Sequence, residues 1–405
     1  KKTAEKHGLV CLLHEKPFEG INGSGKHNNW SLITDDGVNL LNPGRTPAQN
    51  IQFLVFLMAV IKAVDDYADL MRISAASAGN DHRLGGNEAP PAIVSIFLGD
   101  ELNAVLESIE NDTYFGRQEK IQLDTGAHVL PHFTKDNTDR NRTSPFAFTG
   151  NKFEFRMLGS SASVSTPNIV LNTAVAEALT QFYNELEGTA PEDMEKAVHE
   201  LLKRAIRKHK KVIFNGNGYS PEWVEEAEKR GLYNLVSTPE CLPSFIGDRS
   251  VELFTKHHIF TREEIFSRYE ILLENYAKTV CIEARTMAGM LTKDFLPALS
   301  AYSGETAGNA ASKKALLPGL DTSSEEALVT ELTGAYAAVS SGLQELKELL
   351  KEEASIQEMQ KAADFCHDQI LGKMEELRAA ADRAEALIPD EFLPYPTYDQ
   401  LLFSL

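Results

Sequence analysis

The sequence has few cysteines, and they are widely separated in the chain. Cys11, Cys241, Cys281 and Cys366 form no C-x-x-C pair. Zinc sites that can be recognised from sequence, and disulfide frameworks, usually show closely spaced cysteines. The spacing therefore argues against a zinc site and against a disulfide framework. It predicts reduced, mostly buried thiols in a cytoplasmic protein.

Long apolar runs are also missing. The most apolar stretch, IQFLVFLMAVI at residues 51–61, is well short of the ~20 residues that a helix needs to cross a bilayer. We therefore expect a buried helix there and no membrane partner. The opening residues KKTAEK lack the pattern of a signal peptide and are typical of the exposed side of a helix.

Positive charge is in deficit, with 40 Lys and Arg against 59 Asp and Glu and a formal net charge of −19. This balance argues against non-specific binding to nucleic acid. The 42% apolar and 24% charged composition is that of a globular protein, and 405 residues suffice for two or three domains.

The stretch KFEFR near the middle of the chain alternates strictly between charged and aromatic residues. In a strand, Phe153 and Phe155 would share one face, and Lys152, Glu154 and Arg156 the other. The charged face has two interpretations that remain open here. It is either an exposed sheet face with cross-strand ion pairs, or a site where the carboxylate ligates a cation and the bases hold anionic oxygens.

Two glycine-containing loops carry further candidate residues. The segment NGSGKHNNWS at residues 22–31 places His27 just after a glycine turn, but the GxxxxGK[ST] spacing of a phosphate loop is absent. His27 is either structural or a ligand. The loop HRLGGNEAPP at residues 82–91 carries Arg83 and Glu88, and in isolation it is interpreted as an ordinary surface loop.

The second half of the chain is predicted to be mainly helical. Ser-Thr-Pro at residues 165–167 should begin a helix that ends near Leu186, and the capping box Thr261–Glu264 should begin another. The small polar segment 303–313 is predicted to be a loop. Apolar residues at spacings of three and four over 328–350 and 356–384 predict an antiparallel helical hairpin. The tail 393–405 is apolar enough to dock.

Three motifs occur in one order: NGSGKH at 22–27, RLGGNEAP at 83–90, and NR at 141–142 leading to KFEFR at 152–156. This ordered set resembles the catalytic half of glutamine synthetase. The phrases GINGSGKHNNWSL, NDHRLGGNEAPPAI and TGNKFEFRM, with the ending PYPTYDQLLFSL, are most similar to the type III form. The likeness covers essentially the whole chain. It implies a carboxyl-terminal portion, inactive alone, preceded by a β-grasp domain and most of the metal-binding glutamates.

The resemblance implies an ATP-dependent ligase that phosphorylates glutamate and lets ammonia displace the phosphate, giving glutamine. It further implies Mg²⁺ or Mn²⁺ as cofactors and a homo-oligomer of stacked rings with sites between subunits. Two alternatives stay open: a non-catalytic assembly or regulatory subunit, and a related ligase that uses another amine or amino acid.

The resemblance also implies a role for each candidate residue. The implied metal ligands are His27 and Glu154. The implied glutamate-binding residues are Asn22, Gly23, Arg83 and Arg156. The implied ATP-binding residues are Asn29, Ser31, Arg142 and Lys152. The implied catalytic residues are Arg83, Arg142 and Glu88, the last being the flap carboxylate that takes a proton from ammonium. The chain departs from the family at Ala147, where a second arginine is common, and at Asn29, where a histidine is common.

The predicted fold class is α+β. We expect a curved, mostly antiparallel sheet with the charged row on its concave face, helices backing it, and a helical carboxyl-terminal region that ends in the hairpin. The predicted domains are a catalytic α+β part at 1–200, a helical region at 201–320, the hairpin at 321–388 and a docked tail at 389–405.

Overall fold

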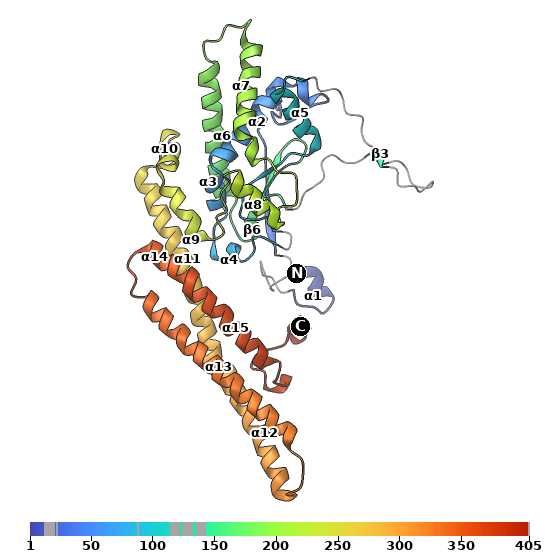
Figure 1. The fold of residues 1–405 in the computed structure, drawn as a ribbon, viewed down its shortest axis with the longest axis vertical. Helices are drawn as coiled ribbons and strands as arrows, with labels where there is room; N and C mark the ends of the chain where they lie inside the picture. Colours follow the sequence, from blue (N-terminus) through green and yellow to red (C-terminus); the bar gives the residue numbers. More distant parts are fainter. Residues whose placement is uncertain are drawn as a thin grey trace. The chain divides into compact units, whose positions relative to one another are not determined.

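A computed structural model describes residues 1–11, 21, 23–86, 89–113, 122–123, 133–134 and 143–403. The chain divides into two compact units. We call His14–Tyr269 the mixed unit, and Lys1–Leu13 with Glu270–Leu405 the helical unit. Each is described by itself, and Figure 1 shows the helices and strands by label. The division into four domains expected from the sequence stays a prediction.

The mixed unit contains a four-stranded sheet in the order β1-β6-β5-β2. Its strands are β1 (Gly25–Trp30), β6 (Phe153–Gly159), β5 (Phe146–Phe148) and β2 (Ile96–Phe97). β6 is antiparallel to both β1 and β5, whereas β2 is parallel to β5. A separate antiparallel pair comprises β3 (Gln122–Leu123) and β4 (Phe133–Thr134). The α+β class, with a mostly antiparallel sheet, is confirmed.

One face of this sheet is aromatic, as the alternation predicted. Phe146 stacks on Phe153 with ring centroids 4.7 Å apart, and it meets Phe155 edge-on at 6.3 Å. Phe148 meets Phe153 edge-on at 5.2 Å. All four rings are buried. Each buried ring contributes about 1.5–3 kcal/mol through removal of apolar surface from water, so this cluster holds β5 and β6 in register.

Helices cover the aromatic face. α2 (Ile51–Asp66), α6 (Ser165–Leu186) and α7 (Met194–His209) pack on one another. Phe53 of α2 reaches Phe148, with ring centroids 6.0 Å apart. From β1, the Asn28 amide donates to Asn168 Oδ1 and the Trp30 indole donates to Asn172 Oδ1, each at 2.8 Å. The aromatic face of the sheet is therefore tied to α6 by both apolar and polar contacts.

Local signals explain where these helices begin and end. Asn50 caps α2 by accepting from the Phe53 amide at 3.1 Å. The 3-10 turn η1 (Pro47–Gln49) precedes this helix, with Thr46 at its N-cap position. α6 has the predicted bounds. The other helices of the mixed unit are α3 (Ala68–Ile73), α4 (Ala78–Asp81), α5 (Asp100–Glu110), α8 (Pro221–Lys229), α9 (Thr238–Cys241) and α10 (Asp248–Lys256), with the 3-10 turns η2 (Lys210–Val212) and η3 (Leu242–Ile246).

The helical unit consists mainly of long helices. Its helices are α1 (Lys2–Lys6), α11 (Arg262–Met290, from Glu270 on), α12 (Leu296–Leu316), α13 (Ser323–Glu353), α14 (Met359–Phe365), α15 (Gly372–Glu385) and α16 (Tyr398–Leu402). Two π-helical segments, η4 (Leu291–Phe295) and η5 (Cys366–Leu371), join consecutive helices, and the 3-10 turn η6 (Asp390–Phe392) precedes α16. None of the described helices combines the length and apolar character that a bilayer crossing requires.

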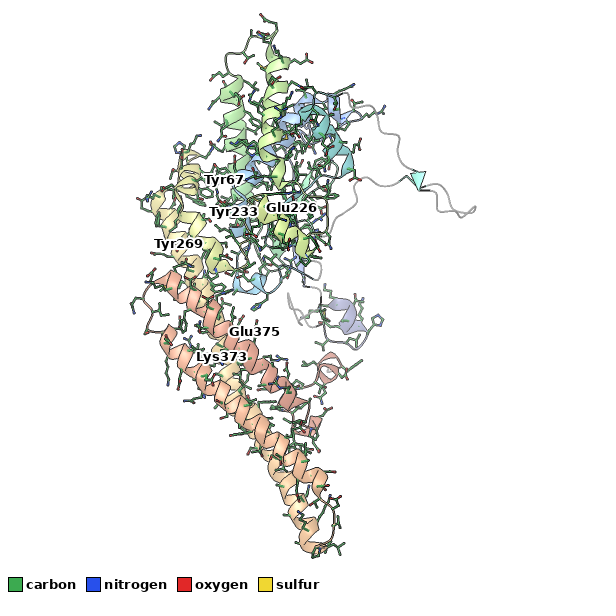
Figure 2. All side chains as sticks on the ribbon, viewed as in Figure 1. Tyr67, Glu226, Tyr233, Tyr269, Lys373 and Glu375 are labelled. Atoms are coloured by element: carbon green, nitrogen blue, oxygen red, sulfur yellow. The ribbon has the colours of Figure 1, made fainter. Side chains whose placement is uncertain are left out.

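The predicted hairpin is confirmed: α13 packs against α15, and Leu332, Leu343, Leu346 and Leu350 of α13 are buried. The surface of this pair carries ion pairs such as Lys373 with Glu345, at 2.7 Å. Lys373 is labelled in Figure 2. The prediction of a loop at 303–313 is wrong, because α12 continues through it and buries Thr306 and Ala310. Small side chains there permit close packing against α13, and that packing outweighs the weak helix propensity of glycine and serine.

Candidate functional site

The centre of the candidate site is a bulge between β1 and β6. Lys26 lies opposite Leu158, and Asn28 lies opposite Phe155. Over this interval β1 advances by two residues while β6 advances by three. Arg156 and Met157 therefore share the position opposite His27. A bulge of this kind changes the direction of side chains and is common beside active sites.

A carboxylate lies between an imidazole and a guanidinium on the polar face of the sheet. His27 Nδ1 is 3.6 Å from Glu154 Oε2. Arg156 donates to the same oxygen from Nη2 at 3.1 Å and from Nε at 3.3 Å. The Glu154 side chain is 11% exposed and that of His27 is 54% exposed. His27 and Glu154, which the resemblance implies as metal ligands, thus lie close together, and the imidazole forms the accessible side of the cluster.

Arg83 lies behind the bulge and binds its backbone. The guanidinium is buried, and Nη1 donates to Met157 O at 3.1 Å and to Asn80 Oδ1 at 3.2 Å. Nη2 donates to Arg156 O at 3.4 Å. The Arg83 side chain, in the segment HRLGGNEAPP that was predicted to be a surface loop, is therefore buried against the sheet and does not extend into solvent. Arg83 contacts the carbonyl groups of both residues that form the bulge.

Gly25 at the start of β1 leaves room for that guanidinium. A Cβ at this position would lie 2.0 Å from Arg83 Nη2 and 2.7 Å from Arg83 Cζ. Any larger residue would displace a side chain that three hydrogen bonds hold in place. The glycine turn noted in the sequence is thus required by a close approach of Arg83.

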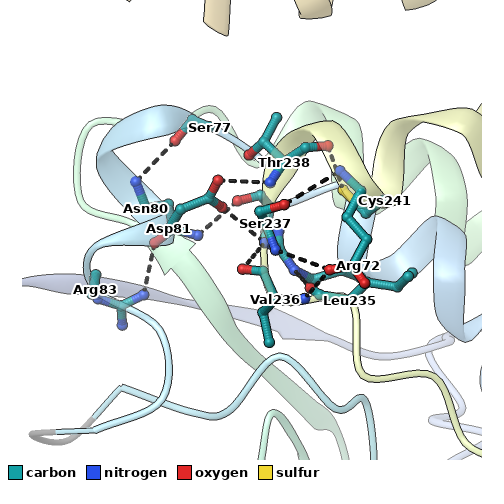
Figure 3. Close-up of polar contacts among 12 residues, drawn as sticks. Arg72, Ser77, Asn80, Asp81, Arg83, Leu235, Val236, Ser237, Thr238 and Cys241 are labelled. Atoms are coloured by element: carbon teal, nitrogen blue, oxygen red, sulfur yellow. Dashed lines mark hydrogen bonds and ion pairs between the residues drawn. The ribbon is translucent and has the colours of Figure 1, made fainter. Parts of the chain in front are cut away.

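A polar network supports the segment that carries Arg83 (Figure 3). Asn80 Nδ2 donates to Ala75 O at 2.7 Å and to Met157 O at 2.8 Å, while its backbone amide is capped by Ser77. The next residue, Asp81, accepts from Arg72 Nη2 at 2.8 Å and from the Thr238 amide at 2.6 Å. α4 is therefore fixed to both the bulge and α9.

The same network contains a buried cysteine. Cys241 Sγ lies 3.3 Å from Thr238 O, to which its thiol donates. Burial raises the pKa of this thiol to about 12. Because the thiolate is the reactive form, Cys241 is inert at neutral pH and acts as packing beside Arg72 (Figure 3).

Some of the remaining predicted residues lie in the part of the chain that the structure describes, and others lie outside it. Ser31, just after β1, donates to Asn151 O at 2.9 Å and to Asn39 Oδ1 at 3.1 Å. Lys152 lies in the same β5–β6 turn, where its carbonyl accepts from the Thr149 amide at 2.8 Å. Asn29 is exposed and lies opposite Glu154 in register, and Gly23 is half-buried. Asn22, Glu88 and Arg142 lie outside the described residues.

The structure therefore gathers His27, Glu154, Arg156 and Arg83 around the bulge, and it puts Ser31 beside the turn that contains Lys152. Sequence reasoning missed Asn80, which binds both the bulge and Arg83. No sequence signal distinguishes this asparagine, because it lies in what reads as a helix-ending stretch.

The donor set fits a hard divalent cation in part. A neutral imidazole nitrogen and a carboxylate oxygen are both ligands for Mg²⁺ or Mn²⁺. Neighbouring ligands at about 2.1 Å in octahedral coordination lie about 3 Å apart, close to the 3.6 Å between His27 Nδ1 and Glu154 Oε2. Two protein donors leave further positions for substrate oxygens and other ligands.

Comparison with known proteins shows what the chain is similar to. Residues 197–314 match the family described as the glutamine synthetase C-terminal domain. The whole chain is 51% identical to a glutamine synthetase of Butyrivibrio fibrisolvens, 43% identical to the type-3 glutamine synthetase of Dictyostelium discoideum and 38% identical to a glutamine synthetase of Bacteroides fragilis. Over its whole length the chain is therefore similar to glutamine synthetases.

The alignments cover 100% of this chain but 58%, 56% and 57% of the three relatives. The chain thus spans a little over half the length of the glutamine synthetases that it matches. The bulge cluster and the α7–α12 segment both lie within the aligned region, whereas the C-terminal domain match covers only the latter.

Proposed function

We propose that a protein containing this chain forms L-glutamine from L-glutamate and ammonia at the expense of ATP, through a γ-glutamyl phosphate. The likeness to relatives named glutamine synthetase supports this reaction, and the similarity to the type-3 protein supports the type III form. The observation that carries the proposal is the placement of Glu154 between His27 and Arg156 on the polar face of the sheet.

In this proposal His27 and Glu154 hold Mg²⁺ or Mn²⁺. The ion, when bound, supplies Lewis-acid neutralisation of phosphate oxygens. Glu154 has a second function, since its Oε2 also fixes the Arg156 guanidinium. A planar guanidinium is well suited to binding a carboxylate or a phosphoryl group. Arg156 would thereby be oriented before substrate arrives.

Arg83 is proposed to act with Arg156 on glutamate and the transferring phosphoryl group. Its hydrogen bonds to the bulge carbonyls couple its position to the backbone of β6. The proposed ATP contacts are Asn29, Ser31, Arg142 and Lys152. Asn22 and Gly23 are proposed to contact glutamate, and Glu88 is proposed to accept a proton from ammonium, so that neutral ammonia attacks the acyl phosphate.

The proposal includes a cytoplasmic homo-oligomer of stacked rings, with glutamate, ammonia and ATP as its small-molecule partners. Support for the assembly comes from the family alone. Its test is the mass of the purified protein in solution.

The metal assignment is tested by Glu154→Gln. This change keeps the shape of the side chain and removes the charge. We expect Mn²⁺ affinity, measured by electron paramagnetic resonance, to fall at least about tenfold, in keeping with the loss of a ligand. The matched control is Glu226→Gln in α8 of the same unit, labelled in Figure 2, where the carboxylate pairs only with Arg230 in the described contacts. Equal Mn²⁺ affinities in the two variants would remove Glu154 from the metal site.

A further inference from the structure

A second cluster of metal-ligating atoms lies in the helical unit. It comprises Cys281 of α11, Cys366 at the start of η5 and Glu353 at the end of α13. One donor atom from each residue lies within 4.8 Å of the others. Both thiols are buried, while the Glu353 side chain is 16% exposed. The three residues come from three different helices, and the cysteines are far apart in the sequence.

The distance between the two sulfur atoms matches metal coordination. Cys281 Sγ and Cys366 Sγ are 3.8 Å apart. Two thiolates bound tetrahedrally to zinc at about 2.3 Å are about 3.8 Å apart. A disulfide would instead require the sulfurs to approach to about 2.05 Å. The observed separation is that of a weak thiol–thiol hydrogen bond and equally suits two ligands of one cation, whereas a disulfide would require the sulfur atoms to move closer together.

The position of Glu353 is also unusual for simple packing. It is the last residue of the 31-residue helix α13, and the carbonyl end of a helix disfavours an acid and favours a cation. The nearest described positive group is Arg285, whose Nη2 is 3.9 Å from Glu353 Oε2 and whose side chain is 56% exposed. Packing of the two thiols against each other does not require the Glu353 carboxylate beside them, so packing alone does not explain this residue.

Charge balance permits a cation here. With both thiols protonated, Glu353 and Arg285 cancel. If a divalent cation replaces the two thiol protons, two thiolates, one carboxylate, the cation and Arg285 again sum to zero. The exchange therefore buries no net charge, and the protons leave to solvent.

The surroundings of the sulfurs do not compete strongly with a metal. Cys366 Sγ is 3.9 Å from Ala277 O, which is a weak contact for a thiol. Cys366 also begins the π-helical segment η5, and such segments are frequent at functional sites.

We propose that Cys281, Cys366 and Glu353 bind a thiophilic divalent cation, zinc being the chemical type, which joins α11, α13 and η5. Two thiolates and one carboxylate supply three of the four tetrahedral ligands, and water supplies the fourth. The role is structural, because the cation would join three helices that otherwise meet here through side-chain packing, the Arg285–Glu353 ion pair and weak sulfur contacts.

The test is titration of the reduced protein with Co²⁺, which gives a strong charge-transfer absorption only when thiolate is a ligand. We expect one such Co²⁺ per chain, displaced by Zn²⁺. Cys281→Ser and Cys366→Ser should each abolish the absorption, and Glu353→Gln should weaken Co²⁺ binding at least about tenfold. Cys241→Ser, which changes a buried thiol in the mixed unit, should leave the signal intact.

Absence of the absorption in the reduced wild-type protein would overturn the proposal. So would an absorption that persists in Cys281→Ser, since it would then come from another thiol. Helicity measured by circular dichroism identifies a variant that fails to fold. If the buried Cys366→Ser does so, the more exposed Glu353→Gln and the Cys281→Ser variant decide the outcome.

Discussion

The two units of the molecule use charge in different ways. In the mixed unit some ion pairs are buried, as in Arg72, which is 1% exposed, and its partner Asp81, which is 12% exposed. In the helical unit the described pairs are mostly at the surface, such as Arg378 with Asp382, at 68% and 50%. Buried charges must be paired to be tolerated, whereas exposed pairs can separate at little cost.

This difference indicates what each unit requires from its charges. Around the bulge, Arg83, Arg156 and Glu154 have fixed partners and therefore fixed positions. On the helical hairpin, the charges keep a surface soluble and the buried leucines hold the helices together. The sharpest tests compare equivalent substitutions in the two units.

The largest effect is expected from Arg72→Met. This change removes the partner of Asp81 and two hydrogen bonds to the carbonyl groups of Leu235 and Val236. Breaking a buried pair costs about 3–5 kcal/mol. The free energy of unfolding of the mixed unit, measured by urea denaturation, should fall by that amount.

Its control is Arg378→Met on α15, which should cost less than about 1 kcal/mol because the pair is exposed. The double variant Arg72→Met/Asp81→Asn should recover part of the loss, since it no longer leaves a carboxylate unpaired. Similar losses for Arg72→Met and Arg378→Met would contradict the distinction between the two units.

A smaller loss is expected from Gly25→Ala. The added Cβ would force Arg83 away from the bulge carbonyls, and overpacking of this kind costs about 1–3 kcal/mol. Gly304→Ala in α12 is the control, because a Cβ there meets nothing within 4 Å, and it should stabilise slightly. Thermal unfolding of the two variants distinguishes these results. A neutral Gly25→Ala would show that Arg83 is not held as described.

The smallest effect concerns acid stability. Burial of Glu177 raises the pKa of its carboxyl group, whereas hydrogen bonds from Lys256, Gln181 and His257 lower this pKa. The hydrogen bonds have the larger effect together, and the pKa of Glu177 lies below the ordinary value of 4.5. Because the folded pKa is the lower one, the stabilisation is complete above about pH 4.5 and is lost as pH falls through the folded pKa. Glu177→Gln should therefore flatten the loss of stability below pH 4.5.

Glu345 in the helical unit provides the comparison. A hydrogen bond from Lys373 lowers its pKa as well, but the carboxylate is exposed and is screened at ~0.15 M salt. Glu345→Gln should leave the pH dependence of the free energy of unfolding below pH 4.5, measured by urea denaturation, unchanged. A larger change for Glu345→Gln than for Glu177→Gln would reverse the expected order.

Much of the fold could be predicted because its signals are local. The Ser-Thr-Pro start of α6, the capping box before α11 and the leucine spacing of α13 are each contained in a few neighbouring residues. The alternation of KFEFR likewise fixed which side chains face the helices. Where tertiary contact overrides propensity, as in 303–313 of α12, prediction from the sequence was wrong.

The site could be predicted only in part, because its geometry comes from pairings between distant segments. The resemblance brought His27 and Glu154 together, and their 3.6 Å separation agrees. The burial of Arg83 beneath Gly25 and the role of Asn80 depend on how α4 meets the bulge, which no local pattern encodes. The approach of Cys281 to Cys366 is equally invisible to a search for closely spaced cysteines.

The bulge also limits how this gene segment can change in length. Beyond the bulge, β1 and β6 are matched residue for residue, with Trp30 opposite Phe153 and Asn29 opposite Glu154. Deleting one codon within β6 would exchange the two faces of the strand. Phe153 and Phe155 would then lie on the polar face, and Glu154 on the face that packs against α6. Between β5 and β6, length variation among related genes should therefore be confined to the turn at 149–151, where an added residue alters neither face.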